Sequence, residues 1–310
     1  MKDGTDIAIG DSGAFERAPS NFREWVSADG SSGFKAEPGR YHLYVSLACP
    51  WAHRTVIVRM LKGLEDVVSM SVVDPIRDKR GWAFRDVPGA ELDPVNGFSF
   101  LAEAYDATDP SYEGRISVPV LWDRETGRIV SNESADVIVM LNEAFDEWGD
   151  ASVDLYPEEL RPEIDELNAR VYETVNNGVY RAGFATSQKA YEDAVRPLFE
   201  TLDSLDERLG TRRYLFGKQI TLADWRLFTT LLRFDPVYHV HFKCNVRRIV
   251  DYPSLWPYLR DLLTVPGVRE TVNMDHIKRH YYGTHPSINP HGIVPVGPVL
   301  DYDAPAGRDS

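Results

Sequence analysis

The chain has 310 residues, a formal net charge of −14 and 43% hydrophobic residues. Its length favours two domains or one large domain with an ordinary core, and its acidity argues against a nucleic-acid partner. No apolar run approaches the roughly 18 residues that span a bilayer, so we expect no membrane partner. Two cysteines, Cys49 and Cys244, are too few for a secreted disulfide framework, and the N-terminus lacks a signal-peptide pattern. We therefore expect a cytoplasmic protein.

The first third of the chain has a strand–helix–strand pattern. Residues 1–38 are rich in Gly, Ser and Asp with a few aromatics, which predicts an irregular N-terminal extension that packs on the body. Residues 41–46 and 67–73 have the composition of strands, and Pro50 between them suits the first position of a helix. This order favours a parallel pair of strands with a crossover helix.

The next segments complete an α/β domain. Residues 75–115 are rich in Asp, Gly and Pro and are predicted to form a long insertion. Strands at 117–122 and 128–131 flank a hairpin turn, and Ser134 begins a helical pattern. The order β-α-β and then β-β-α predicts a thioredoxin-like domain over residues 39–148.

The rest of the chain is predicted to be all-α. Residues 149–162 are expected to form a linker, and 163–310 a helical C-terminal domain that ends in an extended, proline-dotted tail. Thr221 and Asp224 have the spacing of a helix capping box. Two apolar faces are expected to be buried, namely Val171, Val175 and Val179, and Leu198, Leu202, Leu205 and Leu209.

Cys49 is the strongest candidate for a catalytic residue. A lone cysteine is more often a small core residue, but this one is predicted to lie where a strand leads into a helix. The N–H groups and dipole of a helix N-terminus favour a thiolate, and Arg54 adds positive potential. Ala52 stands where a thioredoxin has its second cysteine, so a mixed disulfide on Cys49 would need an external thiol to resolve it.

The segment Cys49-Pro50-Trp51-Ala52-His53-Arg54 resembles the glutathionyl-hydroquinone reductases, also called xi-class glutathione transferases. The resemblance covers residues 15–310. Further motifs that match in order are Gly81-Trp82-Ala83-Phe84, Gly114-Arg115, Val118-Pro119-Val120-Leu121-Trp122-Asp123, Ser131-Asn132-Glu133-Ser134, Val175-Asn176-Asn177-Gly178-Val179-Tyr180, Arg233-Phe234-Asp235-Pro236-Val237-Tyr238, Asp275-His276-Ile277, Tyr281-Tyr282 and Ile288-Asn289-Pro290.

The resemblance implies a fold and a reaction. The fold is an N-terminal thioredoxin-like domain followed by a helical glutathione-transferase C-terminal domain, in a homodimer. The reaction is that of an oxidoreductase acting on a sulfur group. A glutathionyl-hydroquinone and glutathione give hydroquinone and glutathione disulfide through a mixed disulfide on Cys49. Glutathione is then the cosubstrate, with no metal and no nucleotide cofactor.

The resemblance also assigns a glutathione site. The backbone at Val118 would pair with the cysteinyl part of glutathione. Glu133 would accept from its α-amino group, and Ser134 with the helix N-terminus would bind its γ-glutamyl carboxylate. A plain helix cap is the alternative for this pair. Trp82 and Arg115 match residues that contact glutathione, and Arg115 suits the glycyl carboxylate.

Three tyrosines match those that line the pocket for the aromatic substrate, Tyr180, Tyr238 and Tyr281. Tyr180 or Tyr281 would donate a proton to the substrate or orient it. Ordinary core packing is the alternative for each.

The sequence is also compatible with other functions. An omega-like thioltransferase or dehydroascorbate reductase would use one cysteine at the same position, and a non-catalytic glutathione-transferase-like module would only bind. His239, His241 and Cys244, or His276 and His280, could suggest zinc, but no further ligand completes either set. No phosphate-loop or dinucleotide motif occurs, and Cys244 is expected to be structural.

Overall fold

A computed structural model of the chain describes residues 8–308. The described residues form two compact units. The first contains residues 18–154 and Thr271–Thr284, and the second contains residues 8–17, Leu155–Glu270 and 285–308. These are a thioredoxin-like unit and a helical unit, which confirms the predicted fold class.

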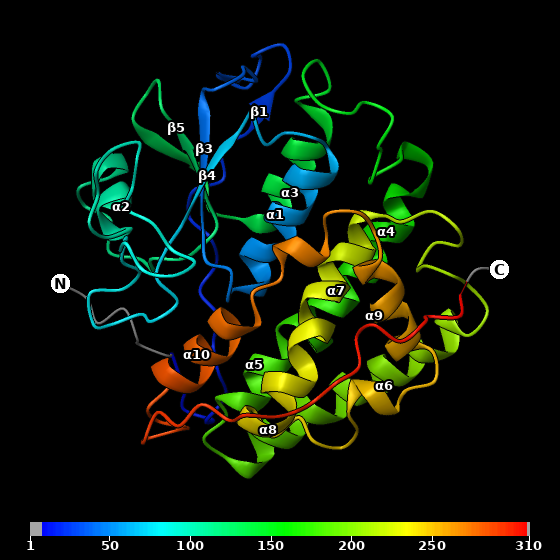
Figure 1. Cartoon of the computed structure of the whole chain (residues 1–310). Helices are drawn as coiled ribbons and strands as arrows, with labels where there is room; N and C mark the ends of the chain where they lie inside the picture. Colours follow the sequence, from blue (N-terminus) through cyan, green and yellow to red (C-terminus); the bar gives the residue numbers. More distant parts are fainter. Residues whose placement is uncertain (1–7, 309–310) are drawn as a thin grey trace. The chain divides into compact units, whose positions relative to one another are not determined.

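A four-stranded mixed sheet forms the centre of the first unit, in the order β4-β3-β5-β6 (Figure 1). The strands are β3 (Tyr41–Val45), β4 (Ser69–Val72), β5 (Val120–Asp123) and β6 (Arg128–Ser131). β3 pairs in parallel with β4 and antiparallel with β5, and β5 pairs antiparallel with β6. All five residues of β3 are buried, as expected for a central strand.

Two helices of the first unit, α1 (Pro50–Leu61) and α3 (Ser134–Glu143), pack side by side against the sheet. Another helix of this unit, α2 (Ala102–Thr108), packs on β6 and lies on the other side of the sheet in Figure 1. α1 begins with Pro50, whose missing N–H is not needed there. It ends before Gly63, which has the positive φ of 63° that stops a helix cleanly.

Part of the segment 75–115, which the sequence predicted to be a long insertion and which contains α2, is ordered by a buried carboxylate. Asp93 accepts a hydrogen bond from the Tyr44 hydroxyl at 3.0 Å. It also accepts from the backbone N–H groups of Asn96 and Phe98, both at 3.1 Å. One side chain therefore folds a loop and attaches it to β3.

The units differ from the predicted domain boundaries at two places. α10 (Met274–Thr284), expected in the helical domain, groups with the thioredoxin-like unit. The physical reason is a set of polar contacts from its histidines. His276 donates to the carbonyl of Pro88 at 3.1 Å, and His280 to that of Pro75 at 2.7 Å.

The N-terminal extension is also divided. Residues 8–17 group with the helical unit, whereas the rest of the described extension groups with the sheet. This second part contains two short paired strands, β1 (Val26–Ser27) and β2 (Phe34–Lys35). The extension therefore packs on both units.

The second unit is built from helices, and the extended C-terminal tail runs along them (Figure 1). Both apolar faces predicted from the sequence are buried. The helical segments are η1 (Glu158–Leu160), α4 (Arg161–Val171), η2 (Tyr172–Asn176), α5 (Gly178–Gly183), α6 (Gln188–Leu209), α7 (Leu222–Arg233), η3 (Phe234–Tyr238), α8 (His239–His241), η4 (Ile249–Asp251) and α9 (Leu255–Leu263). A further short turn of helix, η5, spans Arg269–Thr271.

The capping box predicted at α7 is confirmed. Asp224 accepts from the backbone N–H of Thr221 at 2.8 Å, from that of Leu215 at 3.0 Å and from the hydroxyl of Tyr258 at 2.9 Å. Burial raises the pKa of this carboxyl because it disfavours the charged form, and the hydrogen bonds partly offset this effect by stabilising the carboxylate. None of the helices in residues 8–308 is long and apolar enough to cross a membrane.

Candidate active site

Cys49 lies where the sequence predicted it, as the N-cap residue of α1. Both backbone polar groups of Cys49 are hydrogen-bonded. Its N–H donates to the carbonyl of Ser46 at 3.1 Å, and its carbonyl accepts from the N–H of His53 at 3.0 Å. The thiol is free and partly exposed. Its Sγ lies 3.7 Å from the carbonyl oxygen of Val118. A thiol at this position faces the positive end of a helix dipole and is accessible to a substrate.

The backbone beside the thiol is suited to pairing with a peptide-like ligand. The bond between Val118 and Pro119 is cis. The preceding residue is fixed, because the Tyr105 hydroxyl donates to the carbonyl of Ser117 at 2.8 Å. Within residues 8–308, the N–H of Val118 makes no hydrogen bond. This N–H and the adjacent carbonyl can therefore pair with an extended ligand as a strand would.

Glu133 and Ser134 lie together at the N-terminus of α3. Glu133 is the N-cap, and its Oε1 accepts from the N–H of Ala135 at 3.0 Å. Its Oε2 accepts from the hydroxyl of Ser20 at 2.9 Å. Ser134 is the first residue of the helix, and in the described part of the chain its hydroxyl has no hydrogen-bond partner. Each carboxylate oxygen can accept a second bond, so this site can take both an amine and an anion.

Trp82 lies against α10. Its ring is stacked on that of His280 with centroids 4.9 Å apart and an angle of 21°. The guanidinium of Arg77 lies 5.5 Å from the same ring centroid. Arg115 is exposed, and no hydrogen bond or ion pair of its guanidinium occurs among the described residues. It is therefore available to an anionic ligand without first breaking an ion pair.

The three candidate tyrosines are divided between the units. Tyr281 belongs to α10 and so to the unit that carries Cys49, and it is buried. Tyr180 and Tyr238 belong to the helical unit, where their hydroxyl oxygens are 3.5 Å apart. Phe184 and Phe242 pack against Tyr180 with ring centroids 6.3 and 5.5 Å away. These four rings thus form an aromatic cluster, and the two tyrosine hydroxyls are its polar groups.

Several contacts at these residues were not expected from the sequence. Ser20 of the N-terminal extension reaches Glu133, and His280 of the last helix reaches Trp82. A serine in a Gly- and Ser-rich stretch and one of eight histidines carry no local signal of such contacts. The resemblance around residues 275–282 was the only indication that α10 matters to the site.

The second cysteine is of a different kind. Cys244 is fully buried, and its Sγ lies 3.8 Å from the carbonyl of Phe242. Burial raises the pKa of this thiol, which disfavours the reactive thiolate. Neighbouring His241 hydrogen-bonds to His285 at 3.1 Å. Within residues 8–308, no three His, Cys, Asp or Glu side chains are grouped to hold a metal ion.

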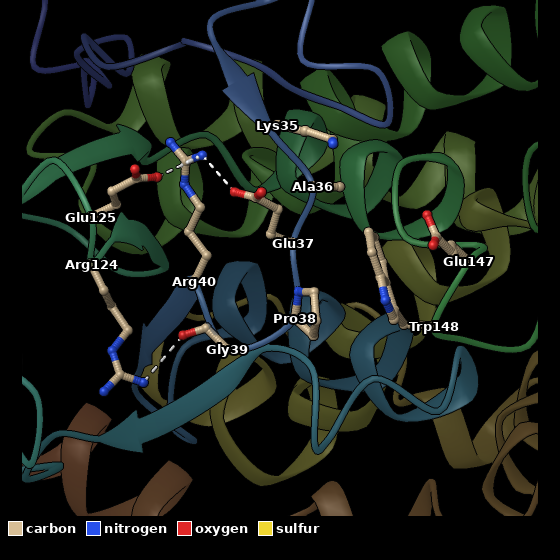
Figure 2. A pocket seen from close by; sticks show the side chains of 10 residues that line it. All are labelled: Lys35, Ala36, Glu37, Pro38, Gly39, Arg40, Arg124, Glu125, Glu147 and Trp148. Atoms are coloured by element: carbon tan, nitrogen blue, oxygen red, sulfur yellow. Dashed lines mark hydrogen bonds and ion pairs between the residues drawn. The ribbon is translucent and has the colours of Figure 1, made fainter.

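A separate shallow pocket lies at the amino end of β3, away from the thiol. It is lined by the segment from Lys35 to Arg40, by the turn that contains Glu125 and by Trp148 (Figure 2). Arg40 bridges Glu37 and Glu125 at 3.0 and 2.9 Å. Because Cys49 follows the carboxyl end of the same strand, this pocket is not part of the thiol site.

Comparison with known proteins agrees with this geometry. The protein-family model for the glutathione S-transferase N-terminal domain matches residues 48–144, and the family model for the C-terminal domain matches residues 188–261. Over 304 residues the chain is 55% identical to glutathionyl-hydroquinone reductase YqjG of Escherichia coli, with 96% of this chain and 93% of the relative covered. It is 54% identical to glutathionyl-hydroquinone reductase PcpF of Sphingobium chlorophenolicum, with 93% and 90% covered.

Solved structures give the same result. The glutathione-bound structure of YqjG matches with a TM-score of 0.92 over 93% of this chain and 96% of that chain. The glutathione-S-transferase Xi from Phanerochaete chrysosporium matches with a TM-score of 0.92 at 51% identity over 95% and 97% of the two chains. With the monothiol at the start of α1, these matches show that the chain belongs to the glutathionyl-hydroquinone reductases, the xi class of the glutathione transferases.

Proposed function

We propose that this chain is a glutathione-dependent reductase that removes glutathione from glutathionyl-hydroquinones. The observation that most supports this is the free, partly exposed Cys49 at the N-terminus of α1, with Ala52 in the place of a resolving cysteine. A single thiol of this kind can accept a glutathionyl group, but it needs an external thiol to release it. The names of the two curated relatives specify the aromatic substrate.

The reaction has two steps. In the first, the Cys49 thiolate attacks the sulfur of the thioether, a sulfur–sulfur bond forms, and the carbon–sulfur bond breaks. The electron pair of that bond goes to the ring carbon, which takes up a proton, and free hydroquinone leaves. In the second, the thiolate of another glutathione attacks the mixed disulfide, which gives glutathione disulfide and restores the Cys49 thiolate. Overall, the aromatic carbon is reduced, and the thioether sulfur of the substrate and the thiol of one added glutathione are oxidised to the disulfide.

The first step needs an acid, because an aromatic carbon is a poor leaving group without a proton. Tyr180 and Tyr281 are the candidates for this donor. Tyr180 has a hydroxyl neighbour in Tyr238, whereas Tyr281 shares a unit with Cys49. Replacing the donor by Phe should lower kcat on a glutathionyl-hydroquinone by about 10²- to 10⁴-fold. The same change in the other tyrosine should have a smaller effect.

Glutathione would bind through the residues at the ends of β5, α1 and α3. The backbone of Val118 would pair with its cysteinyl residue, and Arg115 would bind its glycyl carboxylate. Glu133 would accept from its α-amino group, and Ser134 with the start of α3 would hold the γ-glutamyl carboxylate. Trp82 would contribute an apolar contact. We also propose that the enzyme is a homodimer and works in a reducing, glutathione-rich compartment such as the cytoplasm.

Two substrates test this function against its alternatives. The purified protein should turn over a glutathionyl-hydroquinone faster than the mixed disulfide of glutathione and 2-mercaptoethanol, and Cys49→Ser should abolish both activities. Faster turnover of the disulfide would instead favour an omega-like thioltransferase. Retention on immobilised glutathione without turnover of either substrate would favour a binding module.

A further inference from the structure

Arg17, in the N-terminal extension, lies on the ring of Tyr180. Its guanidinium carbon is 4.8 Å from the centroid of that ring, within the range of a cation–π contact. The Nε of the same guanidinium donates to Oδ1 of Asn177 at 2.7 Å. Asn177 precedes α5, the helix that carries Tyr180, and accepts from the N–H of Tyr180 at 3.0 Å. A cation and a tyrosine are therefore fixed by the same asparagine.

The segment that carries Arg17 is anchored in the helical unit. Residues 8–16 form a small hairpin with a bridge between Ile9 and Phe15. The tip of this hairpin accepts from the N–H of Thr186 at 2.9 Å through the carbonyl of Gly13. A side chain at position 13 would meet Thr186 at 2.9 Å, so the approach is close. The ring of Phe15 packs on Phe184 with centroids 5.4 Å apart. The position of Arg17 thus follows from contacts on both sides of the hairpin.

We propose that Arg17 is a positioning residue that makes Tyr180 a better proton donor in the reductase reaction. A guanidinium over a neutral phenol is attracted only by the ring's quadrupole, but over a phenolate it faces a full negative charge. The contact is therefore stronger after the proton has been transferred than before it. An interaction that grows along the reaction coordinate raises kcat rather than substrate affinity. This inference rests on the proposed function and on Tyr180 as the donor.

The other titratable groups around Tyr180 are less able to play this part. One is the Tyr238 hydroxyl, whose oxygen lies 3.5 Å from that of Tyr180 and which carries no positive charge. Burial lowers the pKa of His241, behind Phe242, to about 4, so this histidine is neutral at working pH. Other groups nearby are Arg181 on the same helix, which pairs with Glu173, His285 against Phe184, and the Cys244 thiol near the carbonyl of Val179.

The first test removes the cation and keeps most of its volume. Arg17→Met should lower kcat on a glutathionyl-hydroquinone about tenfold with little change in KM. It should also move the alkaline limb of the kcat profile to higher pH, because a phenol without the cation loses its proton less readily. Arg17→Lys should recover part of the rate, and Asn177→Ala, which frees the guanidinium, should lose part of it.

A double-mutant cycle separates this role from a purely structural one. In a Tyr180→Phe background, Arg17→Met should change kcat by less than about twofold, because the residue acts only through that hydroxyl. The matched control is Arg247→Met, since Arg247 lies 4.6 Å from the ring of Tyr252 in the same unit and should not affect turnover. Thermal unfolding of each variant should show comparable, modest changes.

The mixed disulfide of glutathione and 2-mercaptoethanol distinguishes the possible failures. Its leaving group is a thiolate that needs no proton on carbon, so Arg17→Met should leave its turnover unchanged. An equal loss on both substrates, or a tenfold loss that persists in the Tyr180→Phe background, would overturn the role of Arg17. Wild-type protein without activity on any glutathionyl-hydroquinone would overturn the proposed function instead. If Arg17→Met does not fold, the same comparisons with Arg17→Lys and Asn177→Ala decide the question.

Discussion

Replacing Glu133 can separate its role as a helix cap from its proposed role in binding glutathione. In Glu133→Gln, an oxygen remains to accept from the N–H of Ala135, but the negative charge is lost. In Glu133→Ala, both are lost. The two variants should therefore differ in stability but share a defect in glutathione affinity.

The expected magnitudes follow from the contacts of this side chain. Loss of an N-cap acceptor costs about 1 kcal/mol, which lowers Tm by roughly 1–2 °C in a chain of this size. The Ser20 hydroxyl retains the carbonyl of Asn132 at 3.3 Å and adds little to this cost. A hydrogen bond from an ammonium to a carboxylate contributes about 1.5–3 kcal/mol, which is about 10- to 100-fold in Kd.

Calorimetric titration with glutathione and thermal unfolding measure the two effects separately. Glu133→Gln should bind glutathione at least tenfold more weakly at nearly unchanged Tm. Ser187→Ala is a matched control, because Ser187 caps α6 by accepting from the N–H of Ala190 at 3.1 Å and should lose stability only. Wild-type glutathione affinity in Glu133→Gln would show that Glu133 is a cap and nothing more.

Two further predictions concern stability. Asp224→Ala leaves four buried donors without their acceptor, namely the N–H of Leu215, the N–H and hydroxyl of Thr221 and the hydroxyl of Tyr258. It should cost about 3–5 kcal/mol in the free energy of unfolding, measured by denaturant titration, whereas Asp251→Asn on the surface should cost at most about 1 kcal/mol. Equal losses would contradict this. Burial lowers the pKa of His42 to about 4 from the 6.5 of a free histidine, so the unfolded chain binds a proton that the fold excludes. The contribution of neutral His42 to the free energy of unfolding should therefore be fully present above pH 6.5 and be lost as the pH falls toward 4. The free energy of unfolding of His42→Gln should fall less steeply over this range. Identical pH slopes in the two proteins would refute this origin.

Much of the fold could be predicted because its signals are local. The alternation at 41–46, the proline at position 50 and the hairpin turn before β6 each act within a few residues. The same holds for the helix start at Ser134 and for the cap at Asp224. Such patterns report which hydrogen bonds a short segment can satisfy by itself. The position of Cys49 at a helix start followed from them directly.

The contacts that complete the site join distant parts of the sequence, and no local pattern indicates them. His280 and Pro75 are 205 residues apart, yet their hydrogen bond helps to group α10 with the sheet. Arg17 and Asn177 are 160 residues apart. Whether a histidine stacks on a tryptophan, or an arginine on a tyrosine, depends on packing that only the folded chain defines. The resemblance supplied Tyr180 and Trp82, but not the residues that position them.

The central claim is that Cys49 carries the glutathionyl group during catalysis. Its most direct test is mass spectrometry of the intact protein after a single turnover with a glutathionyl-hydroquinone and no free glutathione. We expect one glutathione on Cys49, release of an equal amount of hydroquinone, and loss of the adduct when glutathione is added. Hydroquinone release without an adduct on Cys49, or full turnover by Cys49→Ser, would contradict the account.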